Sequence, residues 1–196
     1  MRNTAFFIAG FVLVLLQSNL FRLTRVLLGL LSWIFRTETP ITVPGLVPSL
    51  VLPLILFMGV HEYSLVRGAS VAFALGYLSD LVGVAPLGLY TSTYVAIYIL
   101  ARAAGVRLAA QAMWMQIALA LGFALVHSVM VLVLLAIFGR DAWVPRSLLG
   151  MIVPHVLATG AVAPLVFRLA QRIHVATNSS ARTRSDVSDL PKESPS

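Results

Sequence analysis

The longest apolar run of the chain covers residues 111–138 and contains no charged residue. It exceeds the roughly 20 residues that cross the hydrocarbon core of a bilayer as a helix. Similar runs recur along the chain, and 59% of the 196 residues are hydrophobic whereas 11% are charged. Because backbone inside a bilayer must form its hydrogen bonds internally, the sequence predicts an all-α polytopic membrane protein.

Apolar segments predict a bundle of about six transmembrane helices within a membrane domain of residues 1–175. The stretch 25–36 is bounded by arginines and is too short to cross unaided, which favours an interfacial helix. One bent helix over 5–35, or two crossings within it, are the alternatives. Residues 176–196 are rich in Ser, Thr, Asp and Arg and predict a disordered polar tail. The expected spans are 5–20, 49–60, 68–84, 87–104, 111–138 and 148–169.

The distribution of positive charge predicts the orientation. Of the 14 Lys and Arg residues, nine fall inside and five outside when six spans follow a cytoplasmic N-terminus. This excess predicts that both termini, and hence the tail, are cytoplasmic. The arginines punctuate the apolar runs, so the net charge of +7 indicates contact with membrane lipid and not with nucleic acid. The chain has no cysteine, which excludes disulfides and Cys-ligated metals.

Asp80 is the only acidic residue that lies well inside an apolar run. A carboxylate in hydrocarbon is costly unless it faces protein or water. Gly68, Ala72 and Gly76 precede it at intervals of four, so one helix face consists of three small residues and a carboxylate. Such a face lets a second backbone approach closely. Asp80 is therefore expected on a seam between helices, either as a hydrogen-bond acceptor that fixes a turn or as a proton or ion relay, with the acceptor favoured.

Glycines and prolines interrupt the apolar sequence at two further places, after Asp80 and in the last span. Gly83, Pro86 and Gly88 follow Asp80 and predict a tight helix-to-helix turn with the acid beneath it. Gly160 and Pro164 mark a weak point in the last span, so this helix is expected to be kinked and packed against its neighbours.

Polar and aromatic side chains inside the spans offer few functional groups. His127 and His155 on facing helices are suited to hold a b-type haem, but bonds to a hydroxyl or to a carbonyl freed by Pro154 are favoured. Catalytic signatures such as a Walker loop, His-Glu-x-x-His and Gly-x-Ser-x-Gly are missing. The sequence thus predicts no enzymatic activity, metal or cofactor. A helical stripe of tyrosines predicts packing, with a ligand pocket as the alternative, and consists of Tyr90, Tyr94 and Tyr98.

The spacing of Gly76, Asp80, Leu87 and Gly88, in a run that opens at Gly68, resembles the rod shape-determining MreD family of bacterial inner-membrane proteins. The likeness covers most of the chain. The chain departs from the family pattern around Pro48. Many members have a basic residue before the equivalent proline and Asp or Asn after it, where this chain has Val47 and Ser49. The further residues that carry the likeness are Pro48, Gly160, Pro164, Phe167 and Arg172, and the departures are Val47, Ser49 and the extra length of residues 22–45.

The resemblance implies a non-enzymatic scaffold in sidewall peptidoglycan synthesis and rod-shape determination. Its implied partners are MreC and, indirectly, MreB and the elongation-specific glycan polymerase and transpeptidase pair. The chain is also similar to the six-helix substrate-binding components of vitamin ECF transporters, whose small-xxx-small motif Ala5 and Ala9 match, and this implies a small-molecule uptake subunit as the alternative. The expected structural and interaction residues are Gly68, Ala72, Gly76, Asp80, Gly83, Pro86, Leu87, Gly88, Gly160 and Pro164.

Overall fold

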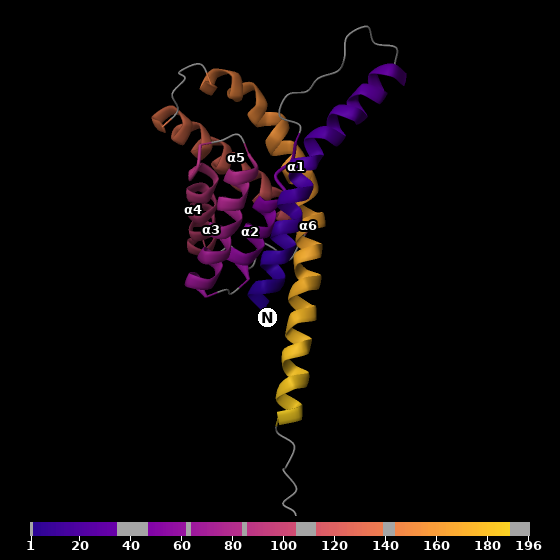
Figure 1. Cartoon of the computed structure of the whole chain (residues 1–196), viewed down its shortest axis with the longest axis vertical. Helices are drawn as coiled ribbons and strands as arrows, with labels where there is room; N and C mark the ends of the chain where they lie inside the picture. The colour runs from indigo at the N-terminus through magenta and orange to yellow at the C-terminus, as the bar shows by residue number, and fades with distance from the viewer. Residues whose placement is uncertain are drawn as a thin grey trace, which may run out of the picture.

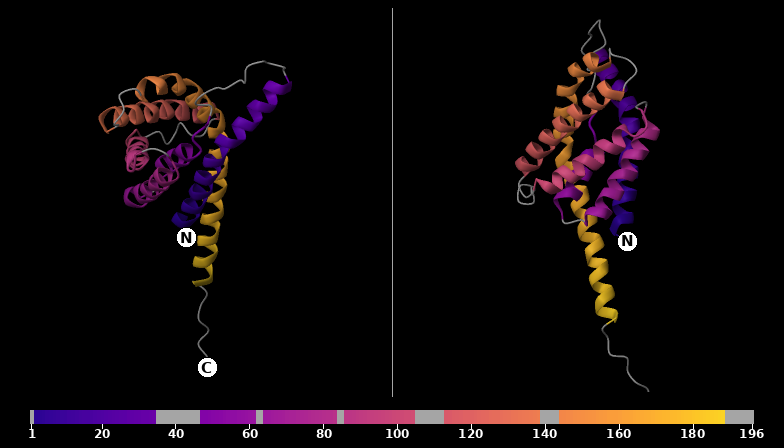
Figure 2. Two further views of the ribbon diagram at one scale, coloured as in Figure 1. Left: turned by 45° about the horizontal axis from the view of Figure 1, so that its top comes forward. Right: turned by 90° about the vertical axis from the view of Figure 1, so that its left-hand side faces the viewer.

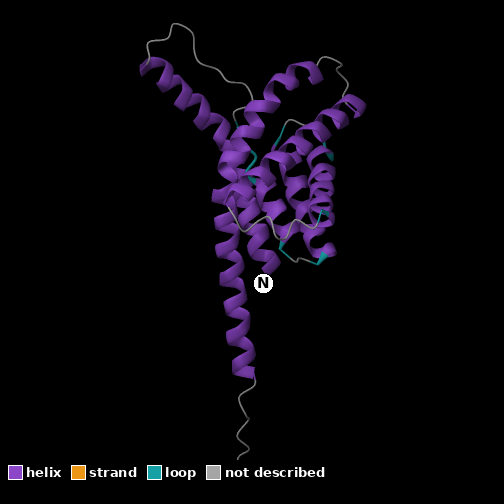
Figure 3. Cartoon of the chain, turned by 180° about the vertical axis from the view of Figure 1, so that it is seen from behind, coloured by secondary structure: helices purple, strands orange, loops and turns teal. Residues whose placement is uncertain are grey.

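Helices are the only regular secondary structure in the described part of the chain in the computed structural model, and no strand occurs in it (Figure 3). This confirms the predicted all-α class. The described residues are 2–34, 47–61, 64–83, 86–104, 113–138 and 144–188. Six helices occupy them: α1 (Arg2–Ile34), α2 (Val51–Val60), α3 (Leu65–Val82), α4 (Leu89–Ala103), α5 (Met113–Phe138) and α6 (Val144–Ser188).

Three helical segments are long and apolar enough to cross a membrane, namely Leu65–Val82, Met113–Phe138 and Gly150–Thr177. Two shorter apolar segments, Thr4–Leu20 and Val51–Val60, accompany them. The chain is therefore a multi-pass membrane protein. Within the bundle, α3 packs along α4 and α5 packs along α6 (Figures 1 and 2).

The short helix α2 forms the centre of the bundle. All ten of its residues are buried, and it contacts each of the other five helices. It is apolar on every side, as expected of a helix without a solvent face. At about 1.5 Å per residue it covers about half of a bilayer core, so the predicted span 49–60 is too short to cross as a helix. Pro53 lies in its first turn, where a backbone N–H has no intrahelical acceptor, so the proline is accommodated there.

Helix α1 covers the N-terminal segment for which the sequence left three alternatives. It runs unbroken through residue 25 to Ile34, so the stretch expected as a separate interfacial helix continues the first helix, as in the single-helix alternative. Phe6 and Leu13 in its first half are buried in the core. The second half projects away from the bundle (Figure 1).

Helix α6 is longer than predicted. The helix continues to Ser188, past residue 176 at which the polar tail is predicted to begin, while residues 189–196 lie outside the described part. Extending an existing helix adds one hydrogen bond per residue without a new nucleation step. Pro154 and Pro164 lie inside it, and the helix changes direction between its contact with α5 and the part beside α1 (Figure 2).

Candidate functional site

The carboxylate of Asp80 caps helix α4 from the last turn of α3. Its Oδ2 accepts hydrogen bonds from Gly88 N at 3.0 Å, Thr91 N at 3.1 Å and Thr91 Oγ1 at 2.6 Å. Its Oδ1 accepts one from Tyr90 N at 2.8 Å, and the residue is 2% exposed. The first N–H groups of a helix have no intrahelical partner, and a carboxylate also complements the positive end of the helix dipole. These bonds match the acceptor role that the sequence favoured for Asp80.

The turn between α3 and α4 places the other predicted residues around this carboxylate. Gly88 precedes α4 with φ of 95°, a left-handed conformation that side chains disfavour. Gly83 has an ordinary φ of −83° and follows α3. Pro86 is exposed, and Leu87 is 70% exposed at the turn. The turn therefore needs glycine at one position and presents an apolar side chain outward at another.

The small face of α3 is the contact surface with α4. A Cβ atom on Gly76 would lie 2.5 Å from Thr91 Cα, so the two backbones leave no room for a side chain. A Cβ on Gly68 would overlap the ring of Tyr98, and Ala72 is fully buried. The predicted close approach of a second backbone is thus present, and it brings the N–H groups of α4 within reach of Asp80.

Gly160 and Pro164 belong to a different interface. Gly160 faces the side chain of Leu121 on α5, and Gly160 and Pro164 are both buried. They support the packing of α6 and are not part of the turn at Asp80.

The segment before α2 forms a second polar centre, which the sequence analysis missed. Residues 47–50 are not helical, and three of their backbone groups bond to side chains of α1 and α6. The Leu50 N–H donates to Gln17 Oε1 at 2.9 Å, and the Ser49 N–H donates to Thr159 Oγ1 at 3.1 Å. His155 Nδ1 donates to the carbonyl of Val47 at 2.8 Å. Irregular backbone at membrane depth needs such internal partners.

His155 thus bonds to a carbonyl, as the favoured interpretation held, but the acceptor is Val47 and not the carbonyl that Pro154 frees. Gln17 and Thr159 were visible in the sequence as polar residues within apolar runs. Their partners lie up to 110 positions away along the chain, so no local pattern pointed to them.

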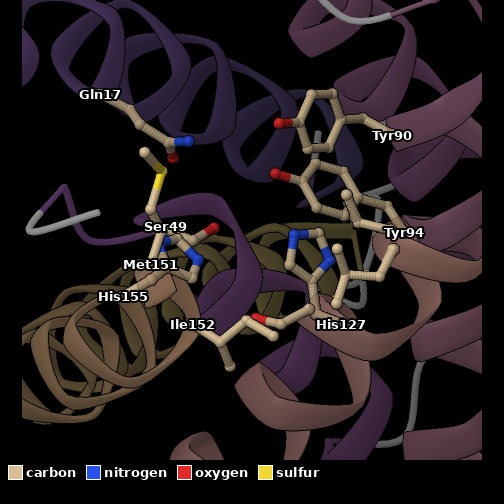
Figure 4. A pocket seen from close by; sticks show the side chains of 11 residues that line it. Gln17, Ser49, Tyr90, Tyr94, His127, Met151, Ile152 and His155 are labelled. Carbon is tan, nitrogen blue, oxygen red and sulfur yellow. The ribbon is translucent and has the colours of Figure 1, made fainter. Parts of the chain in front are cut away.

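A pocket of about 210 Å³ adjoins this segment (Figure 4). The three tyrosines of the predicted stripe have different surroundings. Tyr90 and Tyr94 line the pocket, whereas Tyr98 packs against Gly68. The volume is below the roughly 300 Å³ at which pockets for drug-sized ligands begin. The polar and aromatic lining residues are Gln17, Ser49, Tyr90, Tyr94, His127 and His155.

His127 is one of the buried residues in this lining. It is 4% exposed, and its ring lies nearly parallel to those of Tyr94 and Tyr90, at centroid distances of 5.5 Å and 6.1 Å. The ring of His155 is 6.3 Å away. Within the part of the chain that the structure describes, no group of three or more His, Asp or Glu side chains is arranged to hold a metal ion.

Comparisons of the chain with protein-family models, with curated proteins and with solved structures find no match. The functional argument therefore depends on the residues themselves.

Proposed function

We propose that the chain is a non-enzymatic scaffold of the bacterial cell-elongation machinery, which acts in sidewall peptidoglycan synthesis through association with MreC. MreB and the glycan polymerase and transpeptidase pair are its indirect partners in this proposal. The proposal starts from the resemblance of the Gly76, Asp80, Leu87 and Gly88 pattern to the MreD family.

The observation that carries the proposal is the use of the Asp80 carboxylate. All four of its hydrogen bonds go to the start of α4, and it is buried. A carboxylate held in this way stabilises a helical hairpin and has no evident role in moving protons or ions. The exposed side chain of Leu87 at the end of this hairpin is a suitable contact for a partner protein.

The proposed topology has six crossings and resembles that of the ECF substrate-binding components, with both termini in the cytoplasm of a bacterial inner-membrane protein. The N-terminus and the last part of α6 lie toward the same end of the molecule, which supports an even number of crossings (Figure 1). In this topology α2 and the irregular segment before it cross together as one unit, because the irregular backbone is satisfied by side chains.

The test is affinity purification of the tagged full chain from its own membranes in mild detergent, followed by mass spectrometry of the proteins recovered. We expect MreC and cell-wall synthases with the wild-type chain. We expect MreC to be lost with Leu87→Glu, which places a charge on the exposed hairpin end. We expect it to be retained with Phe138→Glu, which places a charge at an exposed position at the end of α5. If the wild-type chain recovers no MreC, the scaffold proposal is wrong.

The pocket favours a second candidate, the substrate-binding subunit of a small-molecule transporter. This candidate predicts recovery of an ABC-type ATPase in the same purification. Recovery of the ATPase without MreC would replace the scaffold proposal by this one.

A further inference from the structure

We infer that the pocket beside residues 47–50 binds a small uncharged planar molecule, one ring in size, that both donates and accepts hydrogen bonds. This inference goes beyond the scaffold proposal and does not depend on MreC. It rests on a buried polar atom, on the chemistry of the walls and on the size of the space.

The buried polar atom is Nδ1 of His127. It has no hydrogen-bond partner among the described residues, although the side chain of His127 is only 4% exposed. A buried polar atom without a partner is costly, and such atoms are rare in native proteins. The ring of His127 lines the pocket, but this nitrogen is enclosed, so a ligand bonds to it only after the ring turns about its Cβ–Cγ bond. Such a bond would remove the cost, whereas an apolar ligand would leave it in place.

Other polar groups converge on the same space. Figure 4 shows the hydroxyls of Tyr90 and Tyr94 pointing toward the side of the pocket where Gln17 lies. The hydrogen bond from His155 Nδ1 to a carbonyl means that this nitrogen carries the proton, so Nε2 of the neutral ring is an acceptor. The walls thus offer both donors and acceptors, which a ligand with both functions would match.

The charge of the walls sets the charge of the ligand. Among the described residues that line the pocket there is no Asp, Glu, Lys or Arg. An ion taken into a low-dielectric interior without a partner of opposite charge carries a large desolvation cost. The ligand class is therefore uncharged.

The shape of the walls sets the shape of the ligand. The rings of His127 and Tyr90 are inclined by only 19°, and those of His127 and Tyr94 by 26°, so their faces are nearly parallel. Flat rings pack well in offset stacks on such faces. A dry cavity of about 150 Å³ holds benzene, so a pocket of 210 Å³ suits one ring with a polar substituent.

The test uses the purified full chain in detergent and a fixed set of probes. Benzamide, nicotinamide and uracil are neutral, planar and one ring in size, and each both donates and accepts hydrogen bonds. Benzoate has the ring of benzamide with a charge, and cyclohexanecarboxamide has its amide without a flat ring. We expect at least one neutral planar probe to raise the melting temperature at millimolar concentration, and benzoate and cyclohexanecarboxamide to have no effect.

Two variants connect this binding to the pocket. His127→Phe keeps a flat ring and removes the unpaired nitrogen, and we expect it to weaken binding of the effective probe about three- to tenfold, the equivalent of one hydrogen bond. Val131→Phe fills the pocket and should abolish binding. Val129→Phe lies on the exposed side of α5, is not among the lining residues and should leave binding unchanged.

The inference is overturned if none of the neutral planar probes raises the melting temperature of the wild-type chain. It is also overturned if benzoate or cyclohexanecarboxamide stabilises the chain as well as benzamide does, or if Val131→Phe binds the effective probe normally. Because no partner protein takes part, these outcomes are distinguishable from a failure to recover MreC.

Discussion

The turn at Asp80 and the pocket at His127 both bury a polar side chain in an apolar bundle, but the two side chains differ in their hydrogen-bond partners. The Asp80 carboxylate accepts four hydrogen bonds, all from residues 88–91. The Nδ1 of His127 has no partner among the described residues, and the ring of this residue lines a pocket. A satisfied buried group holds the fold together, whereas an unsatisfied one next to a space indicates a place for a ligand.

The largest effect is expected for Gly76→Leu. The side chain would meet the backbone of Thr91, which cannot move without separating α3 from α4 and breaking the bonds to Asp80. We expect a loss of about 3 kcal/mol or more of unfolding free energy, seen as failure to accumulate or as a much lower melting temperature. Gly122→Leu is the matched control, because nothing lies within 4 Å of a Cβ at that position. Equal stability of the two variants would contradict the close approach.

The second effect concerns the carboxylate itself. Asp80→Ala leaves the first N–H groups of α4 without a partner, and we expect a loss of about 2–4 kcal/mol in thermal unfolding. Asp80→Asn keeps one acceptor oxygen and should lie between Asp80→Ala and the wild type. If the melting temperature is unchanged in Asp80→Ala, the turn does not depend on this cap. The alternative role of Asp80 as a proton or ion relay would then be favoured.

The third effect separates the two glycines of the turn. Gly88→Ala forces a side chain into a left-handed backbone conformation, and we expect a loss of about 1 kcal/mol. Gly83→Ala should change stability little, because φ at Gly83 is −83° and any residue adopts it. The comparison is made by the melting temperatures of the two variants, and a larger loss in Gly83→Ala would show that the turn is held in another way.

The smallest effect on the unfolding free energy is expected for His127→Phe, in contrast to the loss expected for Asp80→Ala. His127→Phe removes a buried nitrogen that has no described partner, so the unfolding free energy of the ligand-free chain should be unchanged or raised by about 1 kcal/mol. Thermal unfolding without added probe measures this. A loss as large as that of Asp80→Ala would place His127 among the residues that hold the fold and would remove the main support for a ligand site.

His61, which lies outside both regions, is expected to make the melting temperature depend on pH. His61 follows α2 and stacks on Phe57, and burial lowers the pKa of its imidazole, with His174 acting in the same direction. A histidine with a lowered folded-state pKa destabilises the fold as pH falls below its unfolded pKa of about 6.5. His61→Gln should therefore flatten part of the acid-side decline of the melting temperature. An identical decline in both proteins would assign acid sensitivity to other groups.

The sequence by itself determined the features that depend on local pattern. Apolar runs predicted the helices, the four-residue spacing of Gly68, Ala72 and Gly76 predicted a close contact, and the glycines after Asp80 predicted the turn. The carboxylate and its donors are only 8 to 11 positions apart, so they belong to one hairpin. Helix periodicity and turn residues act over such distances, which is why this region was predictable.

The tertiary structure alone decided the polar centre around residues 47–50 and the pocket. His155 and Thr159 on α6 bond to backbone 108 and 110 positions earlier, and Gln17 on α1 bonds to Leu50. The continuation of α1 past residue 25 and of α6 past residue 176 was likewise not visible in composition. Helix ends and distant partners depend on which helices pack together, and apolar helices look alike in sequence, so only their packing brings these side chains to one place.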